Sequence, residues 1–263
     1  MAKNHKLVLW HVVVGLLAFG LWFDVAKWLQ ALSLEKDFAS YAVILFCLLA
    51  AMVVLGFAIF QKQWLTLSFG GLVWLGFAAN LGFASLNWVG LAILAAVFTW
   101  SRDDVYSESA ERLKIKSRFI LRRGLLPVVL GLFILLSFAA FQSPAFEKIK
   151  DMNQLPPETE RYLRVVVENT IGHKLEEASE KEKQQVVSAV SKETFKEINN
   201  LFGPYFQYAP PILAFTLFLI LWGLSWIFIW LSVGLGALTF WILKKSGFVK
   251  IEEIDVMAEV LVI

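Results

Sequence analysis

The residues of this chain that could most clearly bind a ligand are basic side chains. Six of them fall between positions 112 and 123. They are Arg112, Lys114, Lys116, Arg118, Arg122 and Arg123. A basic cluster of this kind beside a membrane can bind the headgroups of anionic lipids. It can equally serve only to orient the protein, because positive residues accumulate on the cytoplasmic side of membranes. Since that bias is so general, we favour the orienting role.

A second set of polar residues lies inside an apolar stretch. Asn80, Ser85 and Asn87 are the polar side chains of a short segment in the run 63–101, which contains no Asp, Glu, Lys or Arg. They could line a small polar pocket in the membrane, as a transporter of small solutes would need. The same residue types favour turns, so we expect them first of all to form the tip of a helical hairpin.

Three tryptophans recur every fourth residue near the end of the chain. Trp222, Trp226 and Trp230 would share one face of a helix. This aromatic face could form a groove for a lipid or another ligand. We favour its other interpretation, a face that packs against neighbouring helices.

No catalytic constellation accompanies these residues. The sequence contains no Gly-x-Ser-x-Gly elbow, no His-x-x-x-His pair and no Gly-Lys-Ser/Thr phosphate loop. His11 and His173 stand apart from each other, and Cys47 is the single cysteine, which precludes an internal disulfide. We therefore predict a protein that is not an enzyme, with no catalytic residues, no metal site and no cofactor.

The composition explains where these residues must sit. Of the 263 residues, 58% are hydrophobic and only 17% are charged, with a mean hydropathy of +0.65. A soluble domain carries about a quarter charged residues, so this chain is not an ordinary soluble enzyme or a disordered chain. The net charge of +2 gives no reason to expect a nucleic-acid partner. We predict an integral membrane protein with the lipid bilayer as its main partner.

The apolar runs predict six membrane-spanning helices. A span needs about 20 apolar residues, and the run 63–101 is too long for one helix and must fold back. The last run, residues 209–243, is also long; we favour one continuous helix over a hairpin that turns near Gly223. The predicted spans are residues 7–23, 41–60, 64–80, 84–100, 124–142 and 209–243.

The distribution of positive charge predicts the orientation. With six spans, the basic connector 101–123 and the tail 244–263 fall on the same side as the N-terminus. The short loops on the other side hold only Lys27 and Lys36. The positive-inside bias then places both termini in the cytoplasm of a multi-pass protein of the cell membrane.

Residues 143–208 form the one sizeable segment outside the predicted spans, on the extracytoplasmic side. Pro156 and Pro157 predict the start of a helix that ends near Gly172. A second helix, about 175–202, is predicted to end before Gly203. Two amphipathic helices this small cannot bury their apolar stripes alone, so we expect this segment to pack on the spans, on a second copy or on a partner protein.

The predicted fold class is therefore an all-α membrane protein, a six-helix transmembrane bundle with a small helical extracytoplasmic domain. We predict a non-enzymatic interaction or assembly component that uses residues 143–208 to contact a protein partner or to form a homo-oligomer. The alternative is a small-solute transporter or a lipid-handling membrane protein, indicated by the Asn80–Asn87 segment and the tryptophan face.

Two short segments near the C-terminus suggest a resemblance. Pro210-Pro211 opens the last apolar run, and Gly247-Phe248-Val249-Lys250-Ile251 follows it. In these features the C-terminal region resembles uncharacterised multi-pass membrane proteins of reduced-genome bacteria. The resemblance implies a bacterial membrane protein and carries no activity, ligand or site.

Overall fold

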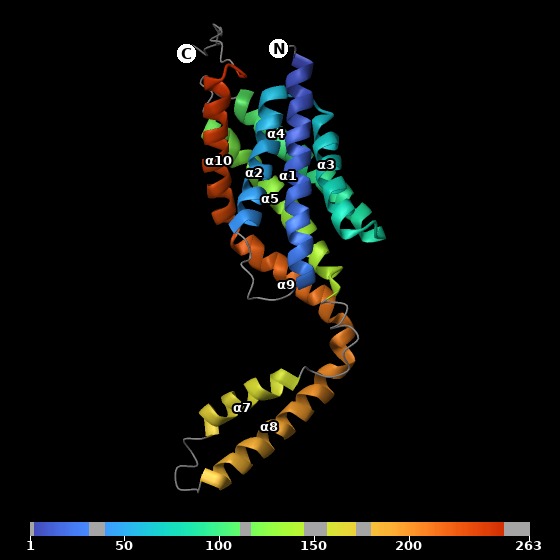
Figure 1. Cartoon of the computed structure of the whole chain (residues 1–263), viewed down its shortest axis with the longest axis vertical. Helices are drawn as coiled ribbons and strands as arrows, with labels where there is room; N and C mark the ends of the chain where they lie inside the picture. Colours follow the sequence, from blue (N-terminus) through green and yellow to red (C-terminus); the bar gives the residue numbers. More distant parts are fainter. Residues whose placement is uncertain (1–2, 32–39, 111–116, 145–156, 172–179, 250–263) are drawn as a thin grey trace, which may run out of the picture. The chain divides into compact units, whose positions relative to one another are not determined.

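The computed structural model describes residues 3–31, 40–110, 117–144, 157–171 and 180–249. Within this part of the chain the regular structure is entirely helical, which confirms the all-α prediction there. The helices, labelled as in Figure 1, are α1 (Lys3–Ala31), α2 (Ser40–Phe60), α3 (Leu65–Leu81), α4 (Ser85–Ala110), α5 (Ser117–Phe141), α7 (Pro157–Ile171), α8 (Glu180–Phe202), the 3-10 helix η2 (Gly203–Tyr208), α9 (Ala209–Gly223) and α10 (Ser225–Lys245).

The chain divides into two compact units. Unit 1 comprises Met1–Ala139 together with Phe218–Ile263, and unit 2 comprises Ala140–Leu217. Unit 1 thus holds α1 to α4, α10 and nearly all of α5, while unit 2 holds α7 and α8.

Helix α2 lies at the centre of unit 1. It packs against α1, α4 and α10, as Figure 1 shows. Leu49, Ala50 and Val53 of α2 are completely buried, as expected for a helix without a single charged residue. Aromatic rings contribute to the packing around α2. Phe57 of α2 and Phe69 of α3 are both fully buried, with 5.6 Å between their ring centres.

One end of unit 1 gathers the basic residues. Lys6 Nζ donates a hydrogen bond to the Phe248 carbonyl at 2.7 Å, and Trp10 Nε1 donates to the Met52 carbonyl at 3.0 Å. The start of α1 therefore lies beside the end of α2 and the residues after α10. We call this region the basic end, defined by Lys6, Lys62, Arg102, Arg118, Arg122, Arg123, Lys244 and Lys245.

Four of the described helices are long and apolar enough to cross a membrane. They contain the candidate spans Asn4–Leu29, Tyr41–Phe60, Ser117–Phe141 and Ser225–Lys245. Leu65–Leu81 and Ala209–Gly223 are apolar but shorter. These helices indicate an integral membrane protein.

The first helix is longer than its apolar run. The sequence predicts a span over residues 7–23, whereas α1 extends from Lys3 to Ala31. Val25, Ala26 and Leu29 remain buried beyond the predicted end, so the packed face of the helix continues. Lys27 does not interrupt it, because its ammonium lies 4.0 Å from the centre of the Phe23 ring.

The predicted connector 101–123 is also different in the structure. Helix α4 continues through its first half to Ala110, and α5 begins at Ser117 instead of residue 124. The extension of α4 is stabilised by packing, since Val105 and Glu108 are buried in it. Arg112, Lys114 and Lys116 lie outside the described residues.

The last apolar run also differs from the prediction of one continuous helix over 209–243. It is divided at Leu224 into α9 and α10. A short-range bond from Ile227 N to the Leu224 carbonyl, 3.0 Å long, forms a turn between the two helices. The break follows Gly223, and glycine disfavours a helix interior by about 1 kcal/mol relative to alanine. The tail beyond residue 249 lies outside the described residues.

Unit 2 contains a pair of helices, α7 and α8, that pack on each other (Figure 1). Their bounds, Pro157–Ile171 and Glu180–Phe202, fall within the two predicted helices. Val187 and Ser191 of α8 are the buried centre of the pair. Gly203 starts a 3-10 helix that takes the chain out of α8.

Candidate interaction sites

Arg123 of the predicted basic cluster is committed to an ion pair. Its Nη1 lies 3.0 Å from Glu108 Oε2, and its Nε lies 3.9 Å from Asp104 Oδ1. Glu108 is only 7% exposed, so the arginine compensates a nearly buried carboxylate. Arg123 therefore joins α5 to α4 and has a structural role.

Gly124, next to Arg123, lies at a close approach of α4 and α5. Ser101 Oγ donates a 2.7 Å hydrogen bond to the Gly124 carbonyl. A Cβ atom at Gly124 would overlap the Val105 side chain and would lie 2.9 Å from Val54 Cγ1. Only glycine fits this contact without a shift of its neighbours.

Arg118, one and a half turns earlier on α5, has a different environment. It lines a groove of about 710 Å³ between the start of α5 and the part of α10 from Trp230 to Lys244. The groove combines two bases with large aromatic rings and small residues; its lining includes Arg118, Trp230, Gly234, Ala237, Trp241 and Lys244. We call it the α5–α10 groove.

The α5–α10 groove brings together residues from two of the predicted sets. Arg122 of the basic cluster places its guanidinium carbon 5.8 Å from the centre of the Trp230 ring. In such a cation–π contact the positive charge lies over the face of the aromatic ring. Within the described part of the chain, neither Arg118 nor Lys244 has a carboxylate partner.

The tryptophan face is turned outward. Trp222, Trp226 and Trp230 are 53%, 61% and 63% exposed, whereas the sequence favours a packing face. The break at Leu224 also separates Trp222, in α9, from the other two in α10. Only Trp230 of the three lines the α5–α10 groove.

The predicted polar segment forms the turn between α3 and α4. Asn87 is completely buried, and its Nδ2 donates to the Gly82 carbonyl at 2.5 Å, while Trp74 Nε1 donates to the Asn87 carbonyl at 2.7 Å. Asn80 bonds within its own helix to the Gly76 carbonyl, and Ser85 is exposed. Gly82 has a φ of 94°, a conformation that suits glycine. These contacts are those of a rigid turn.

A polar contact that sequence reasoning missed joins α1 to α3. His11 Nε2 lies 2.9 Å from Ser68 Oγ, and His11 Nδ1 lies 2.8 Å from the Leu7 carbonyl. The imidazole also stacks on the Trp64 ring, with 5.5 Å between the ring centres. The two partners are 57 positions apart, so no local pattern could have revealed the pair.

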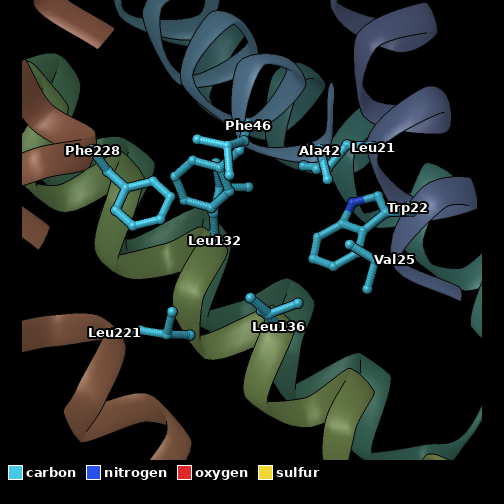
Figure 2. A pocket seen from close by; sticks show the side chains of 10 residues that line it. Leu21, Trp22, Val25, Ala42, Phe46, Leu132, Leu136, Leu221 and Phe228 are labelled. Atoms are coloured by element: carbon cyan, nitrogen blue, oxygen red, sulfur yellow. The ribbon is translucent and has the colours of Figure 1, made fainter. Parts of the chain in front are cut away.

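An apolar pocket of about 70 Å³ lies deeper in unit 1. Figure 2 shows the side chains of Trp22, Phe46, Leu136 and Phe228 around it. The Phe46 and Phe228 rings meet edge to face, 5.2 Å apart. Trp22 Nε1 is buried and has no acceptor within the described part of the chain. A lining this apolar suits an alkyl group.

Unit 2 exposes an apolar face on α7. Tyr162, Val165 and Val166 are 75%, 51% and 59% exposed. Leu163 and Val167, which point the other way, are partly covered in the helix pair. The face formed by Tyr162, Val165 and Val166, here called the α7 face, is not needed to hold α7 to α8.

Among the described residues, no group of three or more His, Cys, Asp or Glu side chains is placed to hold a metal ion. No protein-family model matches the chain, and no match was found among curated proteins or solved structures. The resemblance to membrane proteins of reduced-genome bacteria stays a prediction.

Proposed function

We propose that this protein is a non-enzymatic membrane component that binds another polypeptide through the α7 face. The observation that carries this proposal is the exposure of Tyr162, Val165 and Val166, each more than half accessible on one face of α7. Contiguous apolar side chains at a soluble surface are typical of contact sites.

The chemistry of α7 favours a protein partner over a lipid surface. Helices that lie on membranes are generally rich in Lys and Arg and insert Trp, Phe or Leu. Exposed charges of both signs border the α7 face, among them Arg161 and Glu168. Tyrosine beside aliphatic residues with a mixed-charge rim is the composition of a protein interface.

We also infer that α1 to α5 and α10 all cross the membrane, with the basic end in the cytoplasm. The concentration of Lys and Arg at one end of unit 1 supports this orientation. Helix α3, with 17 residues, is about 26 Å long, close to the thickness of the hydrocarbon layer. Unit 2, between α5 and α10, would then be extracytoplasmic and both termini cytoplasmic.

A photo-cross-linker placed on the α7 face tests the proposed contact. Benzoylphenylalanine is introduced at Tyr162 in the full chain, and native membranes are irradiated. The control carries it at Arg164, which is exposed on the same helix but two residues away and therefore on another side. Cross-linked products are analysed by mass spectrometry.

The proposal predicts a cross-linked polypeptide from the Tyr162 position that the Arg164 position does not give. A product of twice the chain mass would identify a second copy, and any other discrete product a different protein. Cross-links to lipid alone, to the same chain alone, or equally from both positions would contradict the proposal.

A further inference from the structure

We propose that the α5–α10 groove is a binding site for a phospholipid with a negatively charged headgroup. This inference concerns unit 1 alone and is independent of the contact proposed for unit 2. It rests on three observations about the groove: its charge, its aromatic walls and the empty space above one glycine.

The charge of the groove selects the headgroup. Arg118 and Lys244 line it from opposite helices, and Arg122 stands next to Trp230 at its edge. The acids of the adjacent α4, Asp104 and Glu108, are engaged by Arg123. Arg118 and Lys244 are therefore available to bind a phosphate group. Basic pockets between membrane helices generally bind the headgroups of anionic lipids.

The walls of the groove suit the rest of a phospholipid. Trp230 and Trp241, 63% and 56% exposed, are spaced along α10, with Leu238 beside them. Tryptophan prefers the level of the headgroups and the glycerol backbone, which Trp241, near the end of α10, would occupy. Trp230 lies about 16 Å further along the helix, where it would contact the acyl chains together with the aliphatic side chains. Lys245 lies 5.2 Å from the centre of the Trp241 ring and adds to the positive charge at that level.

Gly234, which lines the α5–α10 groove, has open space above it. A Cβ atom at Gly234 would have no neighbour within 4 Å, while a Cβ at Gly236, on the packed side of α10, would lie 3.0 Å from Leu121. Gly236 is therefore explained by helix packing and Gly234 is not. An acyl chain lying against α10 would occupy the space above Gly234.

The test measures lipid binding to the full chain in detergent by native mass spectrometry. The probes are dioleoylphosphatidylglycerol, dioleoylphosphatidylcholine and, as a competitor without acyl chains, millimolar inorganic phosphate. The variants are Arg118→Gln, Lys244→Gln and Gly234→Leu. The matched controls are Lys62→Gln, a base of the basic end near Trp64 but outside the groove, and Gly71→Leu, an equally open helical glycine.

We expect the unmodified chain to bind phosphatidylglycerol in preference to phosphatidylcholine. Arg118→Gln and Lys244→Gln should each lower that affinity about five-fold, the effect of one base near an anionic lipid. Gly234→Leu should abolish the preference by filling the groove, and neither control should change it.

Equal binding of the two lipids by the unmodified chain would overturn the proposal. An unchanged preference in Gly234→Leu would overturn the location of the acyl chains and therefore the site. Loss of bound phosphatidylglycerol to inorganic phosphate would show that the groove recognises a free phosphate and not a lipid.

Discussion

Two arginines of the same helix show how differently one basic cluster can be used. Arg123 is paired with the nearly buried Glu108 and stands beside Gly124, where α4 and α5 touch. Arg118, on the same helix, is exposed at a groove whose floor glycine, Gly234, has open space above it. We call the site at Arg123 and Gly124 the closed site, because neighbouring side chains fill it. We call the site at Arg118 and Gly234 the open site, because no atom of the described residues fills the space above Gly234.

This difference separates structural charge from charge that is available to a ligand. A base that compensates a buried acid cannot give up that contact without cost. A base without such a partner can bind a headgroup at little cost to the fold. The two sites therefore predict opposite responses to the same kind of substitution.

The largest expected difference is between the two glycines. Gly124→Leu should lower the free energy of unfolding by about 3 kcal/mol, because its side chain would collide with Val105 and Val54. Gly234→Leu should leave stability unchanged or slightly raised, since leucine favours helix over glycine. Thermal unfolding of both variants in the same detergent compares them; similar losses would show that the α5–α10 groove is not open.

The two arginines should differ by a smaller amount. Arg123→Gln removes the ion pair with Glu108, and we expect a loss of about 2 kcal/mol, less than for a fully buried pair because Arg123 is partly exposed. Arg118→Gln should change stability by less than about 0.5 kcal/mol. Chemical denaturation in mixed micelles measures both, and a larger loss for Arg118→Gln would contradict the assignment.

The α3–α4 turn provides a smaller contrast of the same kind. Asn87→Leu removes the donor to the Gly82 carbonyl at a buried site and should cost about 1.5 kcal/mol. Ser85→Ala, at an exposed position of the same turn, should have no measurable effect. If the two substitutions proved equivalent in thermal unfolding, the turn would not depend on the Asn87 amide.

The smallest expected effect is the coupling between Arg122 and Trp230. A double-mutant cycle with Arg122→Gln and Trp230→Leu should give a coupling energy of about 0.5 kcal/mol, typical of an exposed cation–π pair. The Lys27–Phe23 pair of α1 serves as a comparison within a single helix. A coupling energy of zero would mean that the Arg122 and Trp230 side chains do not stabilise each other's position at the groove.

Much of the helical framework could be predicted from the sequence, because charge is excluded from the apolar runs. The prediction of 41–60 corresponds closely to α2, Ser40–Phe60, which has no charged residue to obscure its ends. The ends of α1, α4 and α5 could not be placed in this way. There, charged residues continue the helix by lying on a ring, as Lys27 does, or by pairing across helices, as Glu108 does.

The candidate site was harder to predict than the framework. The basic cluster and the tryptophan face were both evident as residue types, but their meeting at Arg122 and Trp230 depends on how α10 packs beside α5. Asp104 and Glu108 on α4 pair with Arg123 and leave Arg118 without a carboxylate partner among the described residues. No spacing in the sequence records these tertiary contacts.

The most direct test of this account compares Arg118→Gln with Arg123→Gln in two measurements on the same samples. The first is preferential binding of dioleoylphosphatidylglycerol over dioleoylphosphatidylcholine, and the second is thermal unfolding. We predict that Arg118→Gln binds dioleoylphosphatidylglycerol about five-fold more weakly and keeps stability. Arg123→Gln, below its unfolding temperature, should lose stability and keep lipid preference. Equal effects of the two substitutions on lipid binding would contradict the distinction between the closed and the open site.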